Sequence, residues 1–305
     1  MSFNPKIKIS LAISAASRSF YPSIFALMSL FITSLNSGSN GNCYYVGNNQ
    51  DAILVDAGLS CREIEKRMAR LDLSMDRVKA LFISHEHTDH IKGVEKLANK
   101  HNLPVYISSG TYNNCKIPFI KKRIVDFKEE QPITIGSLKV EAFSKLHDAA
   151  DPYSFMISDG DINVGVFTDI GFPCEKLLHY FRLCHAAFLE ANYDEDMLDK
   201  GNYPFYLKHR IRGGKGHLSN SQALNVFKQH RSSHLSHLLL AHLSKNNNCP
   251  NLVKDLFERH AEGIKITIAS RFEETPVFAV TGIREAAVPP HYRTSPATQL
   301  GFAFA

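Results

Sequence analysis

The chain has 305 residues, of which 44% are apolar and 21% charged, and its formal net charge is +5. This composition excludes an intrinsically disordered chain, a collagen or coiled-coil rod and a multispan membrane protein, and it leaves enough residues for a large hydrophobic core. The chain has 15 histidines, more than chance usage suggests for its length.

Both ends of the chain differ from the middle. Residues 1–27 hold three basic residues and no acidic one, and their apolar stretch is too short for a membrane helix. We expect a non-native or disordered extension there, with Met28 as the natural start. Residues 283–305 contain three prolines and no apolar periodicity, which predicts a loose tail.

The middle, residues 28–282, contains no repeat, low-complexity segment or linker, so we expect one domain. Because the two ends carry +4 of the net charge of +5, the domain is nearly neutral, and overall basicity is no evidence for a nucleic-acid partner. The six cysteines have wide spacing and no CxxC pair, which favours reduced thiols in a cytoplasmic protein with no membrane partner.

Short apolar runs alternate with helical patterns along the domain. Strands are predicted over Leu30–Ser34, Cys43–Val46, Ala52–Asp56, Ala80–Ser84, Pro104–Ile107, Leu138–Phe143, Ser154–Ile157, Asn163–Thr168, Ala186–Glu190, His237–Ala241, Lys265–Ala269 and Pro276–Val280. Helices are predicted over Cys61–Leu71, His90–His101, Glu175–Phe181, Asn220–Gln229 and Leu252–His260. Strands and helices interspersed in both halves indicate an α/β or α+β sandwich.

The strongest motif is the run His-Glu-His-Thr-Asp-His at positions 85–90, directly after an apolar strand. Side chains at i and i+2 of an extended segment point the same way, so His85 and His87 can bind one cation together. Asp89 and His90 follow as the chain turns into a helix, and they can reach a second cation. Imidazole and carboxylate are ligands for Zn²⁺, and also for Mn²⁺ or Fe²⁺.

Four further polar residues stand at the ends of predicted strands: Asp56, His147, Asp169 and His242. Each alone could be a capping aspartate or a core histidine. Polar residues at the carboxyl ends of several strands meet at one rim of a sheet, however, and together these supply enough ligands for two metals, with Asp169 able to bridge them.

This set, in this order and spacing, resembles the metallo-β-lactamase-fold hydrolase superfamily. The resemblance implies a four-layer αββα sandwich with the site on the sheet rim, and two divalent metal ions, zinc or manganese with iron possible. It assigns His85, His87 and His147 to one metal, Asp89, His90 and His242 to the other, and Asp169 to both. Asp56 would orient ligands or water from behind them.

Finer features, at residues 34–42, 189–194, 210–220 and 242–248, resemble the YycJ/WalJ-type branch of that superfamily. Its members are described as 5′-to-3′ exonucleases of double-stranded DNA linked to DNA repair, which implies a nucleic-acid substrate, with DNA favoured. Two divalent ions about 3.5–4 Å apart suit phosphodiester hydrolysis, because they generate the nucleophile and neutralise charge on phosphorus.

Further roles follow from this hypothesis. Asp89 is a candidate proton handler as well as a ligand, and His217, just before the capping-box Ser219, is placed to protonate the leaving oxygen. Candidate phosphate- and substrate-binding residues lie in a Ser/Gly/Asn-rich loop, after the strand ending at Glu190 and in a basic loop; they are Ser37, Ser39, Asn42, Asn192, Arg210, Arg212 and Lys215.

Three other interpretations stay open. A thioester or lactone hydrolase would keep the fold and need a narrow pocket without the basic loop. An RNA-processing nuclease would often carry a long inserted domain between the later ligands, for which Asp169 and His242 leave little room. A binding module without turnover would tolerate loss of ligand positions.

Overall fold

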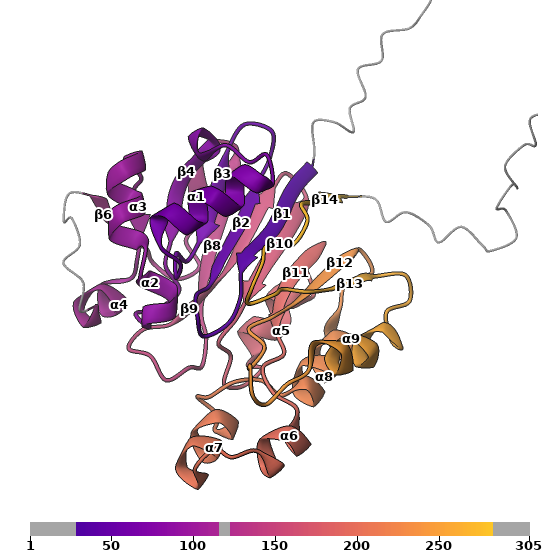
Figure 1. The fold of residues 1–305 in the computed structure, drawn as a ribbon. Helices are drawn as coiled ribbons and strands as arrows, with labels where there is room; N and C mark the ends of the chain where they lie inside the picture. The colour runs from indigo at the N-terminus through magenta and orange to yellow at the C-terminus, as the bar shows by residue number, and fades with distance from the viewer. Residues whose placement is uncertain (1–28, 116–122, 283–305) are drawn as a thin grey trace, which may run out of the picture.

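Two mixed sheets form the centre of the computed structural model, which describes residues 29–115 and 123–282 (Figure 1). The predictions for residues 1–27 and 283–305 lie outside these residues. The first sheet has the order β14 (Phe278–Thr281), β1 (Ser29–Asn36), β2 (Cys43–Gly47), β3 (Ala52–Val55), β4 (Val78–Phe82), β5 (Val105–Tyr106), β6 (Ile124–Val125). The second has the order β13 (Lys265–Ile268), β12 (His237–Ala241), β11 (Ala186–Glu190), β10 (Ile162–Phe167), β9 (Tyr153–Asp159), β8 (Leu138–Ser144), β7 (Ile133–Ile135).

Helices cover the outer face of each sheet, and two helices of the second half project beyond the edge of the sheets (Figure 1). The first half contributes α1 (Cys61–Arg70), the 3-10 turn Met75–Arg77, α2 (Thr88–Ile91), α3 (Val94–His101) and α4 (Ser109–Asn114). The second half contributes α5 (Glu175–Phe181), α6 (Glu195–Lys200), α7 (Phe205–Arg212), α8 (Asn220–His230) and α9 (Pro250–Glu258). None of the described helices is both long and apolar enough to cross a membrane.

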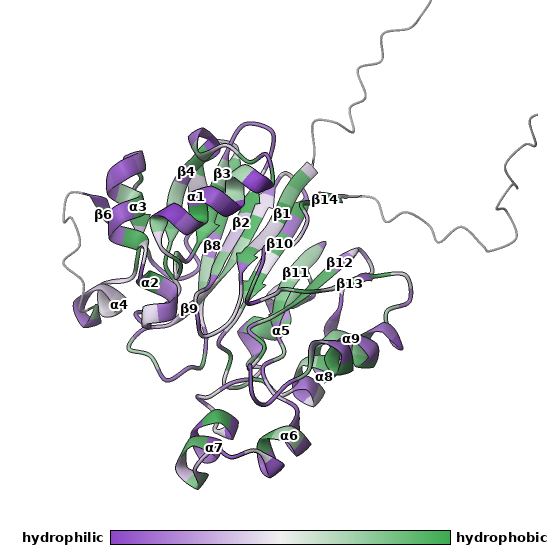
Figure 2. Cartoon of the chain, viewed as in Figure 1, coloured by the Kyte–Doolittle hydropathy of each residue, from purple (hydrophilic) through white to green (hydrophobic). Residues whose placement is uncertain are grey.

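Three hydrophobic clusters correspond to the three contacts between four layers. One lies between the two sheets, one joins the second sheet to α5, α8 and α9, and one joins the first sheet to α1 and α3. In β12, Leu239 faces the other sheet whereas Leu238 and Leu240 face the helices, because successive side chains of a strand point to opposite faces. The predicted αββα sandwich is confirmed, and Figure 2 shows the apolar strands inside the more polar helices.

The predicted strands and helices are present with shifts of one or two residues at most ends. The predicted helix 90–101 is wrong as a single element, because it breaks at Gly93, where a Cβ would lie 2.0 Å from the carbonyl oxygen of Leu59. The strands β6 and β7 and the helices α4, α6 and α7 were not predicted. The segment treated as a basic loop is largely α7, which buries none of its residues and so lacks the apolar stripe that predicts a helix.

The parallel strands bring the loops of the site together. β3, β4 and β5 run parallel in the first sheet, and β10, β11, β12 and β13 run parallel in the second. Their carboxyl ends lie at the same edge of the sandwich, so the residues that follow them converge there. The HxHxDH run is positioned in addition by Asn42, whose backbone N–H donates to the carbonyl oxygen of Asp89 at 2.7 Å.

Gly58→Ala is expected to destabilise this turn strongly. A Cβ at Gly58 would lie 1.7 Å from the carbonyl oxygen of Asp89 and 2.6 Å from the amide nitrogen of Asn42, and backbone cannot move away as a flexible side chain can. We expect a loss of roughly 3 kcal/mol in the free energy of unfolding, measured by denaturant titration. Gly214→Ala is the control, because a Cβ at Gly214 would meet nothing within 4 Å; equal stabilities of the two variants would contradict the expectation.

Candidate metal centre

Three residues of the site have left-handed backbone conformations at the ends of strands. The φ angles are 62° at Asp56, 55° at Asp169 and 54° at His242. Aspartate and histidine are among the non-glycine residues that tolerate this region. Such conformations carry a cost in free energy and collect at functional sites, and here they turn each chain segment away from its strand at the shared edge.

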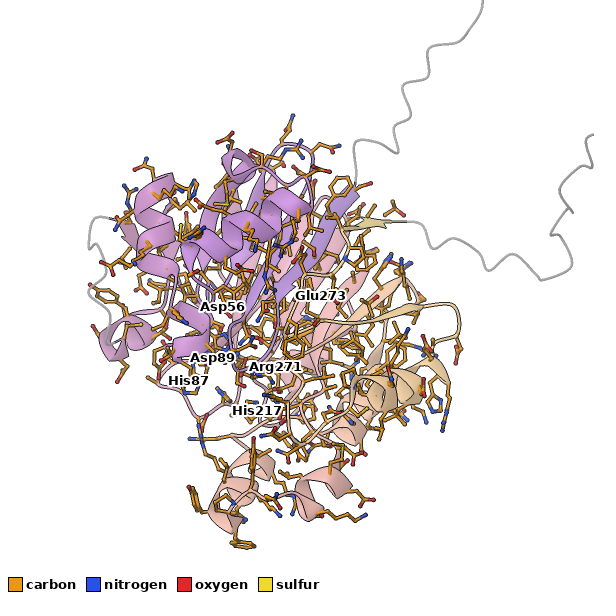
Figure 3. The ribbon with its side chains drawn as sticks, in the orientation of Figure 1. Asp56, His87, Asp89, His217, Arg271 and Glu273 are labelled. Atoms are coloured by element: carbon orange, nitrogen blue, oxygen red, sulfur yellow. The ribbon has the colours of Figure 1, made fainter. Side chains whose placement is uncertain are left out.

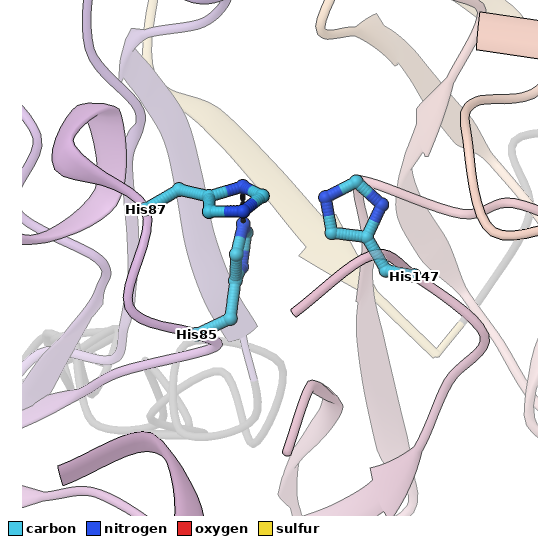
Figure 4. Close-up of side chains that lie close together, drawn as sticks. All are labelled: His85, His87 and His147. Carbon is cyan, nitrogen blue, oxygen red and sulfur yellow. Dashed lines mark hydrogen bonds between the residues drawn. The ribbon is translucent and has the colours of Figure 1, made fainter. Parts of the chain in front are cut away.

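Three histidines form the first cluster, which Figure 4 shows. The Nε2 atom of His85 and the Nδ1 atom of His87 lie 3.0 Å apart, and the ring of His147 lies 5.0 Å from that of His85 and 5.2 Å from that of His87, between centroids. The Nδ1 atom of His147 lies 3.0 Å from the carbonyl oxygen of Gly216, which leaves its Nε2 atom for the cluster. The three side chains offer ligand atoms within 4.8 Å of one another.

The second cluster consists of Asp89, His90 and His242, again with ligand atoms within 4.8 Å of one another. The Oδ2 atom of Asp89 lies 3.6 Å from the Nε2 atom of His90 and 3.8 Å from that of His242. His90 is fully buried, whereas the Asp89 side chain is 22% exposed. The carboxylate of Asp89 is therefore partly accessible to solvent.

Asp169 lies between the two clusters. Its Oδ2 atom is 3.2 Å from the Nε2 atom of His90, and its Oδ1 atom is 3.0 Å from the Nδ1 atom of His242. The Nε2 atom of His147, from the first cluster, lies 3.9 Å from Oδ1. This is the position that a carboxylate shared by two cations requires.

The donor set fits divalent cations. The Nε2 atom of His147 and the Oδ2 atom of Asp169 are buried, and neither makes a hydrogen bond of good geometry with the described residues, although the Nε2 atom of His90 lies 3.2 Å from Oδ2. Buried polar atoms of this kind are costly unless a ligand satisfies them. Burial lowers the pKa of His147 to about 4 and that of His85 well below its usual range, which favours the neutral imidazole that metal ligation requires.

The carboxylates set the charge of the second cluster. Burial lowers the pKa of His90, but Asp169 and Asp56 outweigh burial and raise it to about 10. Burial also lowers the pKa of His242, but Asp169, together with Asp89 and Glu190, outweighs burial and raises it well above its usual range. These protons compensate the buried carboxylates, and a bound cation supplies the same positive charge.

Asp56 lies behind the ligands rather than among them. Its Oδ2 atom is 2.7 Å from the Nδ1 atom of His90 and accepts a hydrogen bond of 2.8 Å from the hydroxyl of Ser84. That hydroxyl is in turn 2.9 Å from the Nδ1 atom of His85. Asp56 therefore positions one histidine of each cluster, directly or through Ser84.

Glu190 is a site residue that was not predicted from the sequence, as is Ser84. Its carboxylate is fully buried and lies 2.7 Å from the Nδ1 atom of His217 and 3.0 Å from the Nδ1 atom of His242. It also accepts hydrogen bonds from the backbone N–H groups of Ile170 and Leu218. In the sequence, Glu190 is the single acidic residue at the end of the apolar strand Ala-Ala-Phe-Leu-Glu. That pattern predicts where the strand ends but does not indicate a functional role.

His217 lies next to both clusters. Its ring centroid is 5.2 Å from those of His147 and His242. The predicted capping box of Ser219 and Gln222 is present at the start of α8. Glu190 holds the Nδ1 atom, so Nε2 is the ring nitrogen left without this partner. His217 lines a small cavity of about 190 Å³, which we call the mouth of the site.

The structure does not bring Ser37 and Asn42 to the surface, where a phosphate would need them. The hydroxyl of Ser37 is used by Tyr44, at 2.8 Å, and by the backbone N–H of His242, at 2.7 Å. The amide of Asn42, which is fully buried, contacts the Oδ2 atom of Asp89 at 3.2 Å. Both side chains hold the ligand loops in place because the Gly-containing turn packs inward.

The other predicted substrate residues divide into two groups. Ser39, Asn192 and Arg210 line the mouth, and the Nε atom of Arg210 pairs with the Oδ2 atom of Asp148 at 2.5 Å. Arg212 pairs with Asp199 and does not line the mouth. Lys215 is exposed. Acidic partners therefore neutralise part of the local positive charge of residues 210–215.

Comparisons with known proteins agree with this geometry. The family described as "Beta-lactamase superfamily domain" matches residues 51–242. The Exodeoxyribonuclease YycJ of Bacillus anthracis is 34% identical over 232 residues, which cover 74% of this chain and 87% of that protein. Among solved structures, the metallo-β-lactamase fold protein YhfI from Bacillus subtilis has a TM-score of 0.63 and 18% identity and covers 83% of this chain and 99% of its own. Zn²⁺-bound PqqB from Methylobacterium extorquens has a TM-score of 0.61 and 14% identity and covers 80% and 99%.

Proposed function

The chain belongs to the β-lactamase superfamily, and from this premise we propose that it is a metal-dependent exodeoxyribonuclease that digests DNA from a 5′ end. The observation that carries the proposal is the position of Asp169 between two clusters of ligands, next to a mouth that His217 lines. Relatives named exodeoxyribonucleases, similar over most of their length, support the substrate class. We further propose that the enzyme acts in DNA repair in the cytoplasm, which suits its free cysteines.

Two divalent ions, zinc or manganese, fit the site in our proposal. His85, His87 and His147 would hold one, Asp89, His90 and His242 the other, and Asp169 both. When bound, such ions polarise a phosphodiester and activate water. Iron would suit the same ligands.

The protein's own groups would complete the reaction. Glu190 holds the Nδ1 atom of His217 at 2.7 Å, so the Nε2 atom is oriented to deliver a proton to the departing 3′ oxygen. Asp89, at the open side of the second cluster, is placed to accept a proton from the attacking water. Asp56 takes no proton in this scheme, because its contacts are with Ser84 and His90.

Helix α7 supports a polymeric substrate over a small molecule. It projects beyond the edge of the sheets with α6 (Figure 1), and it carries Phe205 and Tyr206, which are 83% and 73% exposed. Arg210 of the same helix lines the mouth. Exposed aromatic rings beside cations are the usual means of holding nucleic-acid strands, and a thioester or lactone would not need them.

A substrate panel tests this function. Protein loaded with Mn²⁺ or Zn²⁺ is given 5′-labelled duplex DNA, single-stranded DNA, RNA of the same sequence and a generic thioester. We expect the duplex DNA to be degraded fastest, with label released from the 5′ end. If only the thioester is hydrolysed, the nuclease proposal is wrong. If RNA is degraded faster than DNA, the proposed substrate changes from DNA to RNA.

A further inference from the structure

A second group of side chains suited to a metal ion lies between α1 and α3. It consists of Cys61, Glu65 and His101, whose ligand atoms lie within 4.8 Å of one another; we call it the interhelical cluster. Figure 3 shows His87 and Asp89 of the candidate metal centre at the edge where the strands end, and the interhelical cluster shares no residue with that centre. Among the described residues, it is the one such group that contains a cysteine.

The two helices hold the side chains of the interhelical cluster in place. Cys61 is the first residue of α1, and Glu65 follows one turn later on the same face of the helix. The hydroxyl of Ser60 caps this helix end by accepting a hydrogen bond of 3.3 Å from the backbone N–H of Glu63. His101 is the last residue of α3, and α1 and α3 contact each other on the outer face of the first sheet (Figure 1). The cluster therefore bridges two helices.

Glu65 is at the centre of the interhelical cluster. Its Oε1 atom lies 2.6 Å from the Nε2 atom of His101 and 2.7 Å from the Nζ atom of Lys100. Lys100, together with His101, lowers the pKa of Glu65, so the carboxylate is charged at neutral pH. The side chains of Glu65 and His101 are 24% and 20% exposed, and a dissolved cation can therefore reach them.

Cys61 forms the inner side of the interhelical cluster. It is buried and belongs to the hydrophobic cluster between the first sheet and its helices. Burial raises the pKa of its thiol, and Glu65 raises it further. A thiol of raised pKa is a poor nucleophile, whereas a bound Zn²⁺ ion deprotonates a coordinating thiol outright. The place of this cysteine beside a carboxylate and an imidazole therefore favours metal binding over thiol chemistry.

We propose that the interhelical cluster binds one zinc ion, with the Sγ atom of Cys61, a carboxylate oxygen of Glu65 and the Nε2 atom of His101 as protein ligands and water as the fourth. All three side chains are zinc ligands, and a thiolate disfavours magnesium, calcium and manganese. The thiolate and the carboxylate balance the charge of the ion, and binding releases the thiol proton to solvent. Glu65 and His101 must separate slightly, because ligand atoms around a tetrahedral zinc ion lie about 3.3 Å apart.

The zinc ion clamps α1 to α3 behind the HxHxDH run. The segments that precede these helices are already joined, since the backbone N–H of Gly93 donates to the carbonyl oxygen of Ala57 at 2.7 Å. The backbone N–H of Ala57 donates in turn to the carbonyl oxygen of His90 at 2.8 Å. A clamp between the helices therefore stabilises the backbone that carries a ligand of the candidate metal centre. This inference does not depend on the proposed nuclease function.

Cobalt(II) in place of zinc tests the cysteine ligand directly. A Co²⁺ ion bound to a thiolate has an intense charge-transfer absorption band in the near ultraviolet, and the candidate metal centre contains no cysteine. The metal-free full chain is titrated with Co²⁺, and we expect the band in the wild type and its loss in Cys61→Ala. The control Cys174→Ala removes a partly exposed cysteine that belongs to none of the candidate metal groups among the described residues, and it should keep the band.

Two further variants distinguish a metal site from an ordinary network of ion pairs. His101→Ala should weaken Co²⁺ binding, followed by this band, at least about tenfold, since even residues that only support a ligand cost that much. Lys100→Ala removes the cation that competes for the Glu65 carboxylate, and it should tighten Co²⁺ binding roughly two- to fivefold. The control Lys228→Ala changes an exposed lysine of α8 and should leave the affinity unchanged.

Absence of the band in the wild type, or its persistence in Cys61→Ala, would overturn the proposal and leave Glu65 as the acidic partner of Lys100 and His101. If Cys61→Ala does not fold, the other two variants decide, and an unchanged Co²⁺ affinity in His101→Ala overturns the proposal in the same way. The titrations contain no nucleic acid, so their result is independent of whether the protein proves to be a nuclease.

Discussion

Asp89→Ala is expected to abolish phosphodiester hydrolysis, with a loss of at least about 10³-fold in kcat/KM. Asp89 supplies the exposed carboxylate of the second cluster, 3.6 Å from the Nε2 atom of His90 and 3.8 Å from that of His242. The fold should survive, because Asp89→Ala keeps the backbone hydrogen bond of 2.7 Å from Asn42 to the carbonyl of residue 89 and removes only the longer contact, of 3.2 Å, between the Asn42 amide and the carboxylate. Activity, metal content and melting temperature are the three measurements.

A matched control is Asp76→Ala, an exposed aspartate in the 3-10 turn Met75–Arg77, outside the residues of the site. It should retain full activity and metal content. Asp89→Asn keeps the shape of the side chain but removes its charge, and it should bind less metal than the wild type. Nuclease activity retained in Asp89→Ala would remove this residue from the proposed ligand set.

Glu190→Ala is expected to destabilise the protein by about 3–5 kcal/mol, because it leaves buried donors without their acceptor. These are the two histidine Nδ1 groups and the backbone N–H groups of Ile170 and Leu218. Glu190→Gln keeps one acceptor oxygen and should fold, but it should lose about 100-fold in kcat, since His217 is no longer oriented. Denaturant titration and steady-state kinetics measure the two effects.

The loss of stability in Glu190→Ala depends on pH, in a direction that follows from the pKa of Glu190. Burial raises the pKa of Glu190, but His217 and His242 outweigh it and lower the value from 4.5 to about 2. A carboxyl whose pKa falls on folding contributes stability above pH 4.5 and loses it as the pH falls towards 2. The stability difference between wild type and Glu190→Ala should therefore narrow on acidification through that range. The control is Glu258→Ala, which changes an exposed glutamate of α9. Its stability should equal that of the wild type throughout this pH range.

Most strands and helices, and the ligands of the HxHxDH run, could be predicted because each is specified by a few neighbouring residues. Apolar runs such as that of β12 identify buried strands from a few residues, and the HxHxDH run places four polar side chains within six positions. The resemblance to a known superfamily then supplied the αββα arrangement and the order of the distant ligands. The short β6, β7 and α7 escaped prediction, because two or three residues, or a helix without a buried face, carry no periodicity.

The sequence by itself determined which residue types stand at the ends of the strands, and hence that histidines and aspartates would gather at one edge. Only the tertiary structure decided what each polar residue does once it is there. It gave Glu190 two histidines to hold, turned Ser37 and Asn42 inward, and paired Arg210 and Arg212 with acids. The physical reason is that the burial of a side chain and its hydrogen-bond partners depend on segments far apart in the chain. Arg271 donates to Ser39, for example, and no local sequence pattern relates these two residues.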